Sequence, residues 1–188
     1  TKRSRTFRKI LLSLMGLNMD TFENYKTPGF DELFMRMVYL TATKSKDPSS
    51  KIGAVIVKDN RVISTGYNGF PIGVLDSEER YNNRETKYKF VVHAEHNSIL
   101  TAARFGISTL GATLYTNGLP CNNCMKSIIQ SGINEIVIHS LWPEMKHSDW
   151  EDLSKVSKTM MEESDLKLRI FDGKLNLNGF LNGKVFDI

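Results

Sequence analysis

Two short segments that carry histidine, glutamate and cysteine restrict this chain more than any other feature of its sequence. The first is His93–Glu95 (HAE) and the second is Pro120–Cys124 (PCNNC). Cysteines at positions i and i+3 lie on one face of the first turn of a helix, where the positive helix end favours their thiolate forms. His93, at the start of another helix, would supply a third ligand. The fold is therefore expected to bring two helix starts together around a zinc ion.

The predicted zinc site is of the catalytic kind. Three protein ligands leave the fourth corner of a tetrahedral zinc ion open for water, whereas structural sites are closed. Zinc lowers the pKa of such a water to around 7. Glu95 is not a ligand and can carry protons between that water and a substrate. We predict one catalytic Zn²⁺ bound by His93, Cys121 and Cys124, with Glu95 as the proton donor and acceptor.

A Cys-x-x-Cys pair alone also fits half of a zinc finger or a redox-active pair. The remaining histidines, His96, His139 and His147, show no paired spacing that would complete a finger. A redox pair would leave the segment His93–Glu95 unexplained. Histidine, glutamate and two cysteines in this arrangement form the signature of zinc-dependent nucleobase deaminases. The combined pattern therefore favours a deaminase over either alternative.

The charge is distributed unevenly along the 188 residues. The net charge is +4, but five basic residues precede Asp20, the first acidic residue, so residues 20–188 carry a net charge of −1. Proteins that bind polynucleotides usually present a basic surface, so we expect a small anionic substrate and no polynucleotide partner. We predict a basic extension at 1–19, either a leader or sequence upstream of a start at Met19. Residues 20–188 are predicted to form a single catalytic domain.

Cysteine content and hydropathy indicate the compartment. Two cysteines separated by two residues cannot form a disulfide framework, which favours a reducing environment. No apolar run approaches the roughly 20 residues that span a bilayer, so we expect no membrane association. The chain is predicted to be cytoplasmic, with an organellar leader at 1–19 as the alternative.

The hydrophobic pattern predicts alternating helices and strands, which indicates an α/β fold. Helices are expected at 31–44, 94–105, 121–131 and 150–163, and strands at 52–57, 62–65, 113–116, 135–139 and 168–171. A small hairpin is expected after Gly173. The polar segment 70–90 lacks a convincing period and is predicted to be a functional loop or to contain a small element.

Three segments resemble deoxycytidylate deaminases: Ser45–Gly53 (SKDPSSKIG), Gly66–Pro71 (GYNGFP) and His93–Ile99 (HAEHNSI). The resemblance runs from about Phe30 to Ile138. It implies a three-layer α/β/α cytidine-deaminase-like sandwich with a mixed sheet of about five strands. It also implies hydrolytic conversion of dCMP to dUMP for thymidylate synthesis. A deaminase of another small cytosine nucleoside or nucleotide, or of adenosine in transfer RNA, is the alternative.

The same resemblance implies further residues and partners. It assigns substrate contacts to Asn68, at the sugar 3′-hydroxyl, and to Ala94. It assigns contacts with nucleotide phosphate or with an allosteric effector to Arg104 and Lys51. The expected effectors are dCTP as activator and dTTP as inhibitor, accompanied by Mg²⁺, in a homo-oligomer with a hexamer favoured.

Overall fold

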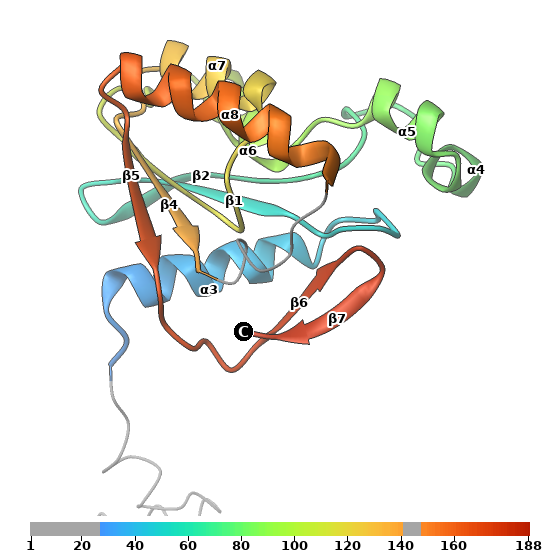
Figure 1. The fold of residues 1–188 in the computed structure, drawn as a ribbon, viewed down its shortest axis with the longest axis horizontal. Helices are drawn as coiled ribbons and strands as arrows, with labels where there is room; N and C mark the ends of the chain where they lie inside the picture. Colours follow the sequence, from blue (N-terminus) through green and yellow to red (C-terminus); the bar gives the residue numbers. More distant parts are fainter. Residues whose placement is uncertain (1–26, 141–147) are drawn as a thin grey trace, which may run out of the picture.

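A computed structural model describes residues 27–140 and 148–188 and shows the predicted α/β architecture (Figure 1). Within these residues, five strands form one sheet in the order β2-β1-β3-β4-β5. The strands are β1 (Gly53–Lys58), β2 (Arg61–Tyr67), β3 (Thr113–Thr116), β4 (Glu135–His139) and β5 (Lys167–Phe171). β1 runs antiparallel to β2 and β3, whereas β3, β4 and β5 are parallel, so the sheet is mixed as predicted. The predicted extension at 1–19 lies outside the described residues.

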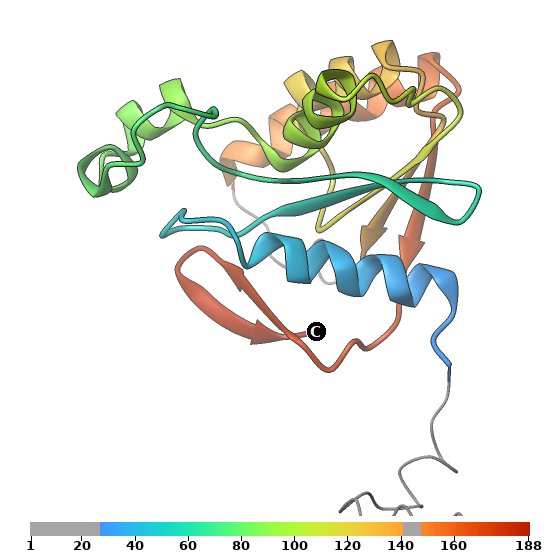
Figure 2. The same cartoon turned by 180° about the vertical axis from the view of Figure 1, so that it is seen from behind.

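Helices cover both faces of the sheet and make three layers (Figures 1 and 2). Helix α3 (Phe30–Ala42) lies on one face. The other face carries α6 (Ala94–Arg104), α7 (Asn122–Gln130) and α8 (Ser148–Glu163). No helix in the described ranges is long and apolar enough to cross a membrane.

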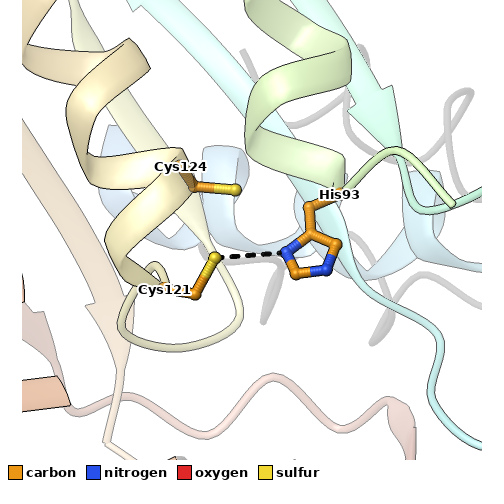
Figure 3. A group of neighbouring side chains, drawn as sticks. All are labelled: His93, Cys121 and Cys124. Atoms are coloured by element: carbon orange, nitrogen blue, oxygen red, sulfur yellow. Dashed lines mark hydrogen bonds between the residues drawn. The ribbon is translucent and has the colours of Figure 1, made fainter. Parts of the chain in front are cut away.

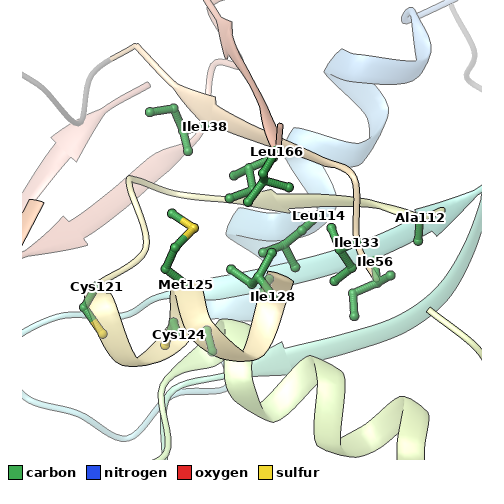
Figure 4. Packing of buried hydrophobic residues seen from close by; sticks show 13 residues of the cluster. Ile56, Ala112, Leu114, Cys121, Cys124, Met125, Ile128, Ile133, Ile138 and Leu166 are labelled. Carbon is green, nitrogen blue, oxygen red and sulfur yellow. The ribbon is translucent and has the colours of Figure 1, made fainter. Parts of the chain in front are cut away.

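Side chains alternate along each strand and build one hydrophobic cluster on each face of the sheet. Val55, Tyr115 and Val137 are buried with α3 residues such as Met35 and Val38. Their neighbours in the sequence point to the opposite face and pack with Met125 and Ile128 of α7 in a second cluster, part of which is labelled in Figure 4. These strand residues are Ala54, Ile56, Leu114, Ile136 and Ile138. Because both faces are covered, these strands are apolar at successive positions rather than at every second one.

The segment 70–90 contains two short helices that the hydrophobic pattern did not resolve. They are α4 (Glu78–Asn82), capped by the Ser77 hydroxyl, and α5 (Arg84–Phe90), capped by the Asn83 side chain. The Phe70 and Tyr81 rings stack with centroids 4.1 Å apart, and Phe90 contacts Phe70. One or two helical turns are too short to show a 3.6-residue period, so only the caps could have indicated them.

The predicted hairpin after Gly173 is present as β6 (Asn178–Leu181) and β7 (Lys184–Asp187). Its two turn residues, Asn182 and Gly183, have φ values of 51° and 74°. Positive φ at both positions is the geometry of a type I′ turn, for which Asn-Gly is the preferred sequence. The hairpin lies on the same side of the sheet as α3 (Figures 1 and 2).

Candidate active site

The ends of two helices bring the three predicted zinc ligands together (Figure 3). His93 is the N-cap residue of α6 and Cys121 is the N-cap residue of α7, both with extended backbone angles. Neither side chain caps its own helix. Both instead point into the space between the two helix starts, where Cys124, in the first turn of α7, also points (Figure 3).

The distances fit a zinc ion. The ligand atoms of His93, Cys121 and Cys124 all lie within 4.8 Å of one another. His93 Nδ1 and Cys121 Sγ are 3.4 Å apart. Two ligands at about 2.1 and 2.3 Å from a tetrahedral zinc are separated by a distance of this order. The donor set, one imidazole and two thiolates at positive helix ends, is one that zinc prefers, and it leaves one coordination position open.

The three ligands also perturb one another's protonation. The hydrogen bond with Cys121 raises the pKa of His93 to about 9. The hydrogen bond with Cys124 lowers the pKa of the Cys121 thiol to about 4, and the same contact raises the pKa of Cys124. A zinc ion displaces the protons that these side chains share, so zinc affinity is expected to rise with pH.

Glu95 lies beside the zinc ligands. It is only 6% exposed, in the first turn of α6, and its Oε2 atom is 3.8 Å from Cys124 Sγ. Burial raises the pKa of Glu95 above its usual value, although the nearby His93 opposes the shift. A raised pKa makes a carboxylate a stronger base, which suits it to proton transfer.

The site opens into a cavity of about 900 Å³. His93, Glu95 and Cys121 line it, as do the two residues expected to contact substrate, Asn68 and Ala94. The Asn68 side chain is engaged with the loop before β1: its Oδ1 accepts from Ile52 N at 2.9 Å, and its Nδ2 donates to Ser50 O at 2.9 Å. Each group keeps one further hydrogen-bonding position, so a ligand contact remains compatible with this role.

The two residues expected to contact phosphate or effectors lie apart from the zinc ligands. Arg104 is exposed in the last turn of α6, at the opposite end of the helix from His93, and it does not line the cavity. The Lys51 side chain donates to the carbonyl of Ser45, and it does not line the cavity either. An effector role for Arg104 or Lys51 stays a prediction.

Two residues that the sequence did not single out also line the cavity. Lys87, on α5, pairs with Asp47 at 3.0 Å, and both side chains are 6% exposed. Asp47 Oδ1 also accepts from the backbone N–H groups of Ser49 and Ser50. Asp-Pro-Ser-Ser is a recognisable turn sequence that could have indicated this cap. No sequence signal identifies Lys87, which lies 40 residues from Asp47.

Comparisons with known proteins agree with this site. Residues 28–140 match the family described as "Cytidine and deoxycytidylate deaminase zinc-binding region". A deaminase of Aliivibrio fischeri is 38% identical over 138 residues, covering 72% of this chain and 88% of that protein. The deoxycytidylate deaminase of Homo sapiens is 40% identical over 115 residues, covering 58% of this chain and 64% of that protein. This chain thus matches less than two thirds of the human protein.

A solved structure shares the fold. The dCMP deaminase of the cyanophage S-TIM5, crystallised with dCMP and dUMP, superimposes with a TM-score of 0.60. The superposition covers 78% of this chain and 100% of that chain at 24% sequence identity. The fold and the site define a zinc enzyme with an open coordination position. The chain belongs to the cytidine and deoxycytidylate deaminase zinc-binding family.

Proposed function

We propose that this chain hydrolyses dCMP to dUMP and ammonia and so supplies dUMP for thymidylate synthesis. The observation that carries the proposal is the cluster of His93, Cys121 and Cys124 with Glu95 buried beside it. His93, Cys121 and Glu95 line one cavity. The relatives named deoxycytidylate deaminase, 34–42% identical to this chain, favour a deoxycytidine monophosphate as the substrate. The net charge of −1 over residues 20–188 is compatible with a mononucleotide and lacks the basic excess of a polynucleotide binder.

The reaction needs a proton carrier next to the attacked ring carbon. When bound, zinc supplies a nucleophile at neutral pH because it lowers the pKa of its water ligand to around 7. Glu95 takes a proton from the nucleophile and delivers it to the ring nitrogen, and it then carries a second proton from the newly added hydroxyl group to the leaving amine. Its burial serves this role, because the raised pKa helps the carboxyl group to hold a proton during each transfer.

Turnover of dCMP by variants at Glu95 and Cys124 tests the proposal. Glu95→Gln is expected to retain about one zinc per chain and to lose about 10²–10⁴-fold in kcat, because the side chain is not a ligand but moves the protons. Cys124→Ala, the matched control in the same cluster, is expected to lose both zinc and activity. Zinc content and ultraviolet-monitored rates with dCMP and deoxycytidine would be measured for each protein.

The outcomes test the proton-transfer mechanism and the choice of substrate independently. We expect dCMP to be deaminated with a much higher kcat/KM than deoxycytidine, since the phosphate can form charge-assisted hydrogen bonds. Near-normal rates in Glu95→Gln would contradict the proton-transfer role. Equal efficiency on the free nucleoside would contradict dCMP as the substrate.

Three remaining features of the proposal come from the family resemblance: a hexamer, activation by dCTP and inhibition by dTTP with Mg²⁺. Location in the cytoplasm comes from the cysteine content and the hydropathy of the sequence. The open position of Arg104 is compatible with a contact outside the catalytic cavity. Arg104 and Glu95 lie about 13.5 Å apart along α6, so an effector bound at Arg104 could act on the catalytic end through a small shift of this rigid helix.

A further inference from the structure

The C-terminal hairpin is joined to the loop before β1 by main-chain hydrogen bonds. Lys51 N donates to Phe180 O at 3.0 Å, and Gly183 N donates to Ser49 O at 2.8 Å. The N–H of Asn182 donates to the Ser50 hydroxyl at 3.3 Å. Figures 1 and 2 both show the tip of the hairpin beside this loop. The segment 49–51 and the hairpin thus form one hydrogen-bonded unit.

The tip of the hairpin is also a wall of the catalytic cavity. Leu181, Asn182 and Gly183 line the cavity together with Ser49 and Ser50. These three hairpin residues lie outside residues 28–140, the part of the chain that matches the deaminase family. The cavity is therefore closed in part by an element that the family match does not include.

The hairpin is anchored well enough to hold a wall in place. Leu175 and Ile188, which flank it, are buried in the cluster formed with α3. Leu175 N and Leu177 N both donate to Ile188 O. Elements fixed by a packed core position a binding site more accurately than loops do.

A chain of contacts shows which part of a nucleotide the hairpin would border. The amide of Asn68, expected to contact the sugar, donates to Ser50 O, and the hydroxyl of Ser50 accepts from Asn182 N. The base must lie at the zinc ligands, so the hairpin tip lies beyond the sugar. Two cations that line the cavity, Arg84 on α5 and Lys158 on α8, make it suitable for an anion, whereas the charge of Lys87 is paired with Asp47.

We propose that the tip of the β6–β7 hairpin, Leu181–Gly183, is a specificity-determining wall of the substrate site that borders the 5′-phosphate of the nucleotide. The inference rests on the proposed function, because it needs a phosphorylated substrate. The hairpin acts in two ways: it positions the loop 49–51, and it places the uncharged side chain of Asn182 where a negative charge would repel the phosphate.

Asn182→Asp tests this proposal because it changes charge with almost no change in shape. Asn182 is exposed, so the change should leave folding intact. We expect KM for dCMP to rise roughly tenfold, equivalent to about 1.4 kcal/mol, with kcat unchanged. KM for deoxycytidine, which has no phosphate, should stay the same.

Val185→Asp is the matched control. It makes the same charge change on the same hairpin, at a side chain that is 66% exposed and does not line the cavity. Its KM for dCMP should match that of the unmodified chain. Zinc content and thermal midpoint, measured on all proteins, would show that both variants are folded.

The outcomes distinguish this inference from the proposed function. If the unmodified chain prefers dCMP but Asn182→Asp leaves KM for dCMP unchanged, the inference alone is overturned. An equal rise in KM for dCMP and deoxycytidine, or an equal effect of Val185→Asp, also overturns it. If the unmodified chain turns over deoxycytidine as efficiently as dCMP, both the proposed function and the inference fail.

Discussion

At the scale of single residues, the ion pair between Lys87 and Asp47 shows how the cavity wall is held. Both side chains are 6% exposed, and Lys87 Nζ also donates to the Ser49 hydroxyl at 3.1 Å. A charge buried this deeply is tolerated only when it is paired and hydrogen-bonded. The pair fastens α5 to the loop before β1 across a separation of 40 residues.

Removing one partner of this ion pair should therefore lower the free energy of unfolding more than removing both. Lys87→Met is expected to lower the free energy of unfolding by about 3–5 kcal/mol, because it leaves the Asp47 carboxylate buried without its partner. The double variant Asp47→Asn/Lys87→Met should regain most of that loss. Urea denaturation of the single and double variants would measure both effects. A double variant as unstable as Lys87→Met would show that the pairing is not the reason for the loss.

At the scale of elements, the packing of α6 on β2 sets where His93 and Glu95 lie. A Cβ atom on Gly66 would come within 2.4 Å of Ala94 O and of Ser98 N, so only glycine allows the helix to lie this close to the strand. Asn97 adds a hydrogen bond from its Nδ2 to Tyr67 O at 2.9 Å. The strand thus fixes the helix start from which His93 and Glu95 project.

Gly66→Ala should accordingly disturb stability and metal binding together. The added methyl group meets backbone atoms, which cannot move aside, so we expect a loss of about 1–3 kcal/mol in stability. Weaker zinc binding should accompany it, since His93 lies at the displaced end of α6. Gly69→Ala is the control, because a Cβ atom there meets only ordinary contacts at 3.5 Å or more. Denaturation curves and zinc titrations with normal values for Gly66→Ala would contradict the argument.

At the scale of the whole molecule, His139 joins three distant parts of the chain. It ends β4, its Nδ1 atom lies 2.8 Å from the Tyr39 hydroxyl of α3, and its Nε2 atom lies 3.1 Å from Gly173 O. A carbonyl oxygen can only accept, so Nε2 carries the proton and Nδ1 accepts from Tyr39. Burial lowers the pKa of His139, although the carbonyl of Gly173 and the charge of Asp172 oppose the shift. Folding therefore favours the neutral form of this ring.

The sign of the resulting pH dependence follows from the lowered pKa. As the pH falls through the unfolded pKa of 6.5, the unfolded chain takes up a proton at His139 more readily than the folded chain, so the free energy of unfolding falls. The contribution is at most about 1.4 kcal/mol per pH unit. As the pH is lowered from 7.5 to 5.5, we expect the free energy of unfolding to fall less steeply in His139→Gln than in the unmodified protein. Urea denaturation of both proteins at the two pH values would test this, and equal slopes would contradict it.

The local features of the fold and of the zinc site followed from the sequence. β3 and β4 have the predicted bounds, and α6 and α7 begin within one residue of those expected. Hydrophobic periodicity and capping act over a few residues, so the sequence displays them directly. The ligand chemistry of His93, Cys121 and Cys124 is equally local, because their side chains and their positions at helix starts already select zinc.

Tertiary structure alone decided how distant segments complete the site. The partners of Asn68, the pairing of Lys87 with Asp47 and the hairpin tip at the cavity each join residues that are 16 or more positions apart. Tertiary packing also left Arg104 at the far end of α6, away from the cavity. Such contacts depend on how the layers pack against one another, and no short-range pattern records that packing. The sequence by itself determined the metal and the class of chemistry, whereas the packing of the layers determined the shape and the charge of the substrate cavity.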